Sequence, residues 1–212
     1  MITNRFLYLH IRRTGGHLIK AFFRQIDGLQ REEVHPATTG PAMVRECKRL
    51  GLKPVPPSVV FIRNPYWYYV SMWAWIGTAI FVRKPAHIGD FKNYMTMIKE
   101  GSVNFRLFKP LTHHWNTMGA DKAEFVGRFE SLYDDIVEIS RVYMPDLITP
   151  ERALRILKSL PLFVPSRRRI AEAGQKVYDD WRNYYDDETR SWVEKWDAGL
   201  LERFGYEFAA FG

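Results

Sequence analysis

The sequence predicts an α/β fold: a single domain with a central, mostly parallel sheet and helices on both faces. Short apolar runs at residues 6–11 and 58–62 are typical of buried parallel strands, and each precedes a segment that reads as a helix. Strands that alternate with helices in this way form parallel sheets covered on both faces. In such sheets ligands bind at the carboxyl ends of the strands.

The expected helices begin and end at ordinary helix signals. Proline stands at the first helical position at Pro65 and Pro150, directly after the capping residues Asn64 and Thr149. Prolines at positions 54, 56 and 57 end the helix before the second strand. The segments expected to be helical are residues 16–26, 41–50, 65 onward, 90–99, 111–116, 130–143, 150 onward and 186–204, with a third strand at 123–126.

Length, composition and charge narrow the classes of function. The chain has 212 residues and is 46% hydrophobic, which excludes a disordered chain and suits one domain over residues 1–212. Lys and Arg outnumber Asp and Glu by 31 to 24, and this surplus favours acidic ligands without choosing among them. The lone Cys47 cannot form an intramolecular disulfide, and neither a signal-peptide pattern nor a membrane-spanning stretch is visible. We therefore expect a cytoplasmic protein.

The most informative stretch joins the first strand to the first helix. It is basic and contains two glycines, which let the backbone bend closely around a ligand. The N-terminus of the following helix offers N–H groups to an anion, and the arginines add permanent positive charge. The stretch therefore predicts a binding site for phosphate or sulfate. Its candidate ligand-binding residues are Arg12, Arg13, Thr14, Gly15, Gly16 and His17.

A second candidate anion site follows the second strand. Arg63 ends that strand, and Ser71 lies in the helix that follows, so a guanidinium and a hydroxyl can bind the same anion. Two separated anion sites at the ends of neighbouring strands predict a ligand with two separated anionic groups. A bisphosphorylated nucleotide fits this expectation better than a simple triphosphate.

Several segments, taken in order, resemble the sulfotransferases that use 3′-phosphoadenosine 5′-phosphosulfate (PAPS), in particular the carbohydrate-type branch. They are residues 9–16, residues 61–65 with Ser71, residues 126–132, and residues 184–189 and 204–208 near the end of the chain. The resemblance implies a P-loop-like fold, a 5′-phosphosulfate loop at residues 9–16 and a 3′-phosphate site at Arg63 and Ser71. It also implies PAPS as cosubstrate, no metal, and transfer of a sulfuryl group to a hydroxyl or amine of an acceptor such as a carbohydrate.

The loop departs from the family pattern at several positions. Arg13 stands where the family has a catalytic lysine, Arg12 replaces a proline, and His17–Leu18 replaces a Thr-Ser pair that holds the 5′-phosphate. By the resemblance, Arg13 would stabilise charge on the bridging oxygen of the leaving nucleotide. The backbone N–H groups from Thr14 to His17 do not depend on these replacements.

The general base near the acceptor is expected to be a histidine, because histidine titrates near neutral pH. His35 is the first candidate, since related carbohydrate sulfotransferases often have a histidine base in the loop after the first helix. His17 is the second candidate, with hydrogen bonding to phosphate as its alternative role. His10 is expected to pack in the core. His113 and His114 have no acidic or cysteine residue at ligand spacing, so no metal site is expected.

Two other classes of function stay open. A P-loop nucleoside or sugar kinase has a related fold, but this loop lacks the Gly-x-x-x-x-Gly-Lys-Ser/Thr pattern that holds a magnesium nucleotide. A non-catalytic protein that binds a nucleotide or a glycan is the other class, and the altered loop favours it. No recognisable nucleic-acid-binding module is present, so nucleic acid is not an expected partner.

Overall fold

The computed structural model describes residues 1–34, 39–76, 89–101, 108–160, 168, 170–171 and 174–209. The chain divides into two compact units, each assembled from two separate stretches of sequence. Unit 1 comprises Met1–Arg63 and Trp115–Phe163, and unit 2 comprises Asn64–His114 and Val164–Gly212. The single domain expected over residues 1–212 stays a prediction.

Unit 1 contains a five-stranded sheet with the strand order β3-β1-β2-β4-β5. The strands β2 (Leu7–Leu9), β4 (Ser58–Ile62) and β5 (Phe125–Arg128) run parallel to one another. The strands β1 (Ile2–Thr3) and β3 (Arg31–Glu32) are antiparallel and extend the sheet beyond β2. The sheet is therefore mixed, and the predicted parallel arrangement holds for the part formed by β2, β4 and β5.

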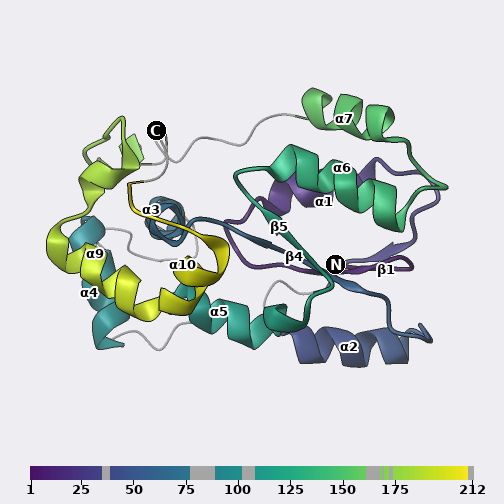
Figure 1. Ribbon diagram of the computed structural model, residues 1–212, viewed down its shortest axis with the longest axis horizontal. Coiled ribbons are helices and arrows are strands. Elements are labelled where there is room, and N and C mark those ends of the chain that lie inside the picture. The colour runs from purple at the N-terminus through teal and green to yellow at the C-terminus, as the bar shows by residue number, and fades with distance from the viewer. Residues whose placement is uncertain are drawn as a thin grey trace. The chain divides into compact units, whose positions relative to one another are not determined.

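Helices cover both faces of this sheet, which confirms the predicted α/β class (Figure 1). The helices α1 (Gly16–Arg24), α6 (Leu132–Tyr143) and α7 (Pro150–Ser159) lie on one face, and α2 (Gly40–Arg49) lies on the other. The core beneath the first three helices is rich in aromatic side chains, which remove large apolar areas from water. Its fully buried rings are those of Phe6, Tyr8, Phe22, Phe23 and Phe61.

The strand β5 starts two residues later than the sequence predicts. Residue Glu124 lies outside the strand, and its Oε2 accepts hydrogen bonds from the backbone N–H and the hydroxyl of Ser58, each at 2.6 Å. Inside the strand, Gly127 leaves room for the ring of Phe61, because a Cβ at residue 127 would lie 2.4 Å from that ring. The hydrophobic pattern does not encode either of these contacts.

Unit 2 is built around α3 (Pro65–Ile76), in which most residues are buried. The helix starts where the Asn-Pro signal predicts, and Oδ1 of Asn64 accepts the backbone N–H of Tyr66 at 3.0 Å. The helices α4 (Phe91–Glu100) and α9 (Asp187–Trp196) and the short 3-10 helix η3 (Trp181–Tyr184) pack against α3. Its buried aromatic residues, which include Tyr68, Tyr69 and Trp73, form the core of unit 2. The helix α5 (Leu111–Met118) begins in unit 2 and ends in unit 1.

The long helix expected over residues 186–204 is wrong: it consists of α9 and α10 (Ala198–Phe204), which are separated at Asp197. Oδ2 of Asp197 accepts the hydroxyl of Tyr69 at 2.7 Å, and Oδ1 accepts both the N–H and the hydroxyl of Thr112 at 2.7 Å. Burial raises the pKa of the Asp197 carboxyl and the pKa of Tyr69. The three hydrogen bonds compensate for burying the carboxyl at the position where the two helices meet.

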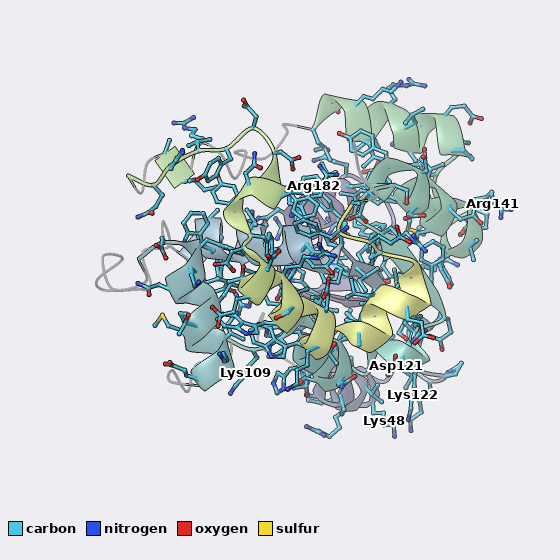
Figure 2. The ribbon with its side chains drawn as sticks, turned by 60° about the vertical axis from the view of Figure 1, so that its left-hand side comes forward. Lys48, Lys109, Asp121, Lys122, Arg141 and Arg182 are labelled. Atoms are coloured by element: carbon cyan, nitrogen blue, oxygen red, sulfur yellow. The ribbon has the colours of Figure 1, made fainter. Side chains whose placement is uncertain are left out.

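Part of the surplus positive charge lies on the surface of unit 1. Three exposed cations project outward from the chain: Lys48 on α2, Lys122 in the short 3-10 helix η2 (Ala120–Lys122) and Arg141 on α6 (Figure 2). Exposed, solvated charges of this kind do not select a partner. In the described part of the chain, every helix is too short or too polar to cross a membrane.

Candidate anion-binding site

The loop that joins β2 to α1 adopts an unusual backbone conformation; residues Arg12–Gly15 are called the anion loop below. Arg13 has a φ of +64° and Gly15 a φ of +90°. For a residue with a side chain, the left-handed region costs about 1–2 kcal/mol, and Arg13 is the sole non-glycine residue with positive φ in the described stretches. The hydroxyl of Thr14 donates to the carbonyl oxygen of Ile11 at 2.7 Å and braces the turn. A costly conformation persists where surrounding contacts fix it, and such positions cluster at functional sites.

The N-terminus of α1 follows this loop directly. Gly15 occupies the N-cap position and offers no side chain to the helix, and the first turn contains no acidic residue. The N–H of Ile19 donates to the carbonyl oxygen of the N-cap residue Gly15 at 3.1 Å. The first turn of a helix generally leaves its N–H groups without intrahelical acceptors, and the helix dipole makes this end partly positive. These properties suit an anionic ligand.

Arg63 extends from the end of β4 to the anion loop. Its Nη1 donates to the carbonyl oxygen of Arg13 at 3.2 Å, and its guanidinium carbon lies 4.0 Å from the centroid of the Phe129 ring. Only 4% of Arg63 is exposed. The guanidinium is thus held by a backbone acceptor and by a cation–π contact. Two motifs that the sequence places on different strands therefore meet in unit 1.

The segment after β5 also contacts the anion loop. The N–H of Phe129 donates to the carbonyl oxygen of Ile62 at 2.8 Å, which fixes this segment to the end of β4. A Cβ at Gly15 would lie 2.8 Å from Cδ2 of Leu132 and 3.5 Å from the Phe129 ring. Gly15 is therefore required both by its positive φ and by the side chain packed against it. Residues 126–132, the third segment of the family resemblance, thus pack against the anion loop.

His10 packs against the first residue of α1. A Cβ at Gly16 would lie 2.0 Å from Nε2 of His10, and the ring centroids of His10 and Tyr8 are 5.5 Å apart. Burial, and next the positive charge of Lys20, lower the pKa of His10 from 6.5 to about 3, so the imidazole is neutral at neutral pH. The sequence predicts that His10 packs in the core. The glycine at position 16 is the signal that a side chain approaches the helix closely here.

The remaining predicted site residues belong to different parts of the chain. Arg12 is half-buried in the anion loop, and His17 is exposed in the first turn of α1. Ser71 is buried in α3 and belongs to unit 2, whereas Arg63 is the last residue of the first stretch of unit 1. The shared binding of one anion by Arg63 and Ser71 therefore stays a prediction. His35 lies outside the described residues.

A charged cluster beside α1 was not predicted from the sequence. Glu33 accepts hydrogen bonds from Nζ of Lys20 at 3.0 Å and from Nη2 of Arg24 at 2.9 Å. Partial burial opposes ionisation, but the hydrogen bonds from the two cations lower the pKa of Glu33 overall. Glu33 is consequently ionised and engaged by two cations, which makes it a poor general base. Only the spacing of Lys20 and Arg24 on one helical face could have indicated the cluster.

Among the described residues, no three His, Cys, Asp or Glu side chains are grouped so that they could hold a metal ion. Comparison of the chain with protein-family models, curated proteins and solved structures finds no match. The function is therefore inferred from the site itself. The parts of this site are the anion loop, the N-terminus of α1, Arg63 and the segment of residues 126–132.

Proposed function

We propose that the chain is a PAPS-dependent sulfotransferase that transfers a sulfuryl group to a hydroxyl or amine of an acceptor, with carbohydrates as the first acceptor class to test. One observation carries the proposal: the guanidinium of Arg63 donates to the carbonyl oxygen of Arg13 while it lies over the ring of Phe129. Three segments of the sequence resemblance therefore contact one another at the carboxyl ends of parallel strands, where ligands bind in α/β sheets.

The residues of the anion loop fit a phosphosulfate group. The anion loop leads into the N-terminus of α1, a position that favours anions, and the first turn of this helix contains no carboxylate that would compete with a ligand. Arg12 and Arg13 supply positive charge beside these N–H groups. The loop has no lysine followed by a hydroxyl residue, the pair that holds a magnesium nucleotide in P-loop kinases. The loop thus favours a metal-free anion over a magnesium nucleotide.

The proposed chemistry assigns one role to each candidate residue. PAPS, when bound, supplies an activated sulfuryl group. Arg13 stabilises the negative charge that develops on the bridging oxygen of the leaving nucleotide, and the N–H groups of α1 orient its 5′ end. Arg63 and Ser71 bind the 3′-phosphate. His35 removes the proton of the acceptor hydroxyl, and His17 is the second candidate for this role.

Thermal unfolding with adenosine 3′,5′-bisphosphate (PAP), the product nucleotide, tests the binding part of the proposal. A ligand at 100 times its Kd adds about 2.7 kcal/mol of stability. For a chain of this size, 1 kcal/mol raises Tm by about 2–4 °C, so PAP should raise Tm by about 5–11 °C. The Arg13→Ala variant should lose most of this shift. Arg141→Ala is the matched control, since Arg141 is an exposed residue of α6 paired with Glu138. An unchanged Tm with PAP would refute the proposal.

Turnover distinguishes the three classes of function. We expect transfer of radiolabelled sulfate from PAPS to a hydroxyl-rich acceptor from a glycan panel, and loss of transfer in His35→Ala with PAP binding retained. Binding of PAP without transfer to any acceptor would identify a non-catalytic nucleotide-binding protein. Stabilisation by ATP with magnesium, and not by PAP, would identify a kinase.

A further inference from the structure

One buried polar atom next to the anion loop is not explained by the fold. Nδ1 of His10 is buried and has no hydrogen-bond partner among the described residues. The ring is enclosed by Tyr8 on one side and by the first residue of α1, Gly16. Buried polar atoms are nearly always hydrogen-bonded, so an exception in a folded protein calls for a physical reason.

The missing partner determines which ring nitrogen carries the proton. A neutral imidazole has one N–H donor and one bare nitrogen acceptor. A buried N–H without an acceptor is rarer in folded proteins than a buried acceptor without a donor. The proton of His10 therefore resides on Nε2, and Nδ1 is the bare nitrogen. His10 consequently presents an N–H donor at the tip of its ring.

This donor lies beside the N-terminus of α1. Each Cα–Cβ bond of a helix tilts toward the helix N-terminus, and Nε2 of His10 lies 2.0 Å from the position that a Cβ at Gly16 would take. Nε2 is therefore located at the end of the helix where N–H groups lack intrahelical acceptors. Burial, and next the positive charge of Lys20, keep the His10 ring neutral, so the ring acts here as a neutral hydrogen-bond donor.

We infer that His10 is a ligand-binding residue of the anion loop, and that its Nε2–H donates a hydrogen bond to the anionic group bound at the N-terminus of α1. The inference rests on the proposed function, because it assigns a further contact at the same site. It explains why the first helical residue is a glycine: a larger residue would displace the donor. It also explains why Nδ1 is buried without a partner, because the orientation of the ring that brings Nε2 to the ligand leaves Nδ1 facing the interior.

Isothermal titration with PAP and with inorganic sulfate tests the inference, using variants that keep or remove the donor. The amide nitrogen of Gln reaches the place of Nε2, whereas the shorter Asn does not. A hydrogen bond to a charged group is worth about 1.5–3 kcal/mol, so His10→Asn and His10→Ala should bind PAP roughly 10- to 100-fold more weakly. His10→Gln should bind within about fivefold of the wild type, and the exposed His113→Ala serves as the matched control.

A spectroscopic measurement on the wild type complements the titration and remains possible if the variants do not fold. Long-range ¹H–¹⁵N correlation spectra of the wild type should show the His10 proton on Nε2, and the Nε2 resonance should shift when PAP or sulfate is added. A proton on Nδ1, or wild-type affinity in both His10→Asn and His10→Ala, would overturn this inference and leave the proposed function standing. Absence of any binding of PAP or sulfate to the wild type would overturn both.

Discussion

The structure predicts that the substitution Gly16→Ala lowers the stability of the protein, because the added methyl group overlaps the His10 ring. The added methyl group would lie 2.0 Å from Nε2, 2.4 Å from Cδ2 and 2.9 Å from Cε1 of the His10 ring. Three ring atoms overlap at once, so a small rotation of the ring cannot relieve the contact. The ring is also held by Tyr8, whose centroid is 5.5 Å away. The helix or the imidazole must therefore move.

Two opposing effects determine the size of the change. Overpacking of a well-filled site costs typically 1–3 kcal/mol. Alanine favours a helix over glycine by up to about 1 kcal/mol, less at the first helical position than in the interior. The free energy of unfolding should therefore fall by about 1–2 kcal/mol, which corresponds to a Tm lower by roughly 2–8 °C.

Urea unfolding followed by circular dichroism measures this change, and two further variants isolate its cause. Gly199→Ala is the matched control, because Gly199 is also helical and a Cβ there would meet no atom within 4 Å; this variant should be neutral or up to about 1 kcal/mol more stable. In a His10→Ala background the methyl group at position 16 finds room, so Gly16→Ala should then be neutral or stabilising. The coupling energy between the two sites should be about 1–3 kcal/mol. A Gly16→Ala protein as stable as the wild type would refute the close approach of His10 to α1.

Three further outcomes are expected. The free energy of unfolding should fall as pH decreases from 6.5 toward 3, by at most about 1.4 kcal/mol per pH unit, because the unfolded chain protonates His10 (pKa 6.5) before the folded chain does (pKa about 3). Tyr69→Phe should lower the free energy of unfolding by about 1–3 kcal/mol, since it leaves buried Asp197 short of one donor and the Leu111 N–H without its acceptor. Arg63→Lys should weaken PAP binding by roughly tenfold or more, because an ammonium cannot both bond the Arg13 carbonyl and lie flat over an aromatic ring.

Each of these outcomes has a direct check. Urea titrations between pH 4 and pH 8 should show a flatter pH dependence in His10→Gln, and an equal slope would place the acid sensitivity elsewhere. Thermal unfolding of Tyr69→Phe should be compared with Tyr133→Phe, since Tyr133 is a partly buried residue of α6; equal losses would contradict the importance of the buried carboxyl. Isothermal titration of Arg63→Lys with PAP should show weaker binding, and wild-type affinity would remove Arg63 from the site.

The sequence predicted the secondary structure best where local signals were strong. The strand at residues 58–62 and the helix start at Pro65 agree with the structure, because a β-branched run and an Asn-Pro cap act through neighbouring residues. The two-residue strands β1 and β3 were not predicted, since they depend on backbone pairing with distant residues. The break at Asp197 was also missed. At the break, the Asp197 carboxylate accepts hydrogen bonds from Tyr69 and Thr112, which are far away in the sequence and leave no local signal.

The site shows the same division. The sequence indicated Arg63 and the glycines of the anion loop, because strand ends and glycine turns are visible in the residue pattern. It could not indicate that Arg63 bonds the carbonyl oxygen of Arg13, or that Leu132 fills the space beside Gly15. From the sequence, His10 was predicted to lie in the core, because it belongs to an apolar run. Such a run does not indicate which side chain faces the N-terminus of the next helix. Those relations depend on how distant segments pack.

The discontinuity of unit 1 has a consequence for synthesis on the ribosome. The pairing of Val59 with Phe125 joins β4 to β5 across a long stretch of chain that belongs mostly to unit 2. At about 5–20 residues per second, β5 is made roughly 3–13 s after β4, and until then β4 has an edge of unpaired backbone groups. During this interval the unpaired edge of β4 can pair with another chain. Fragments that end before residue 125 should aggregate, and unit 1 cannot be produced by a single cut of the chain.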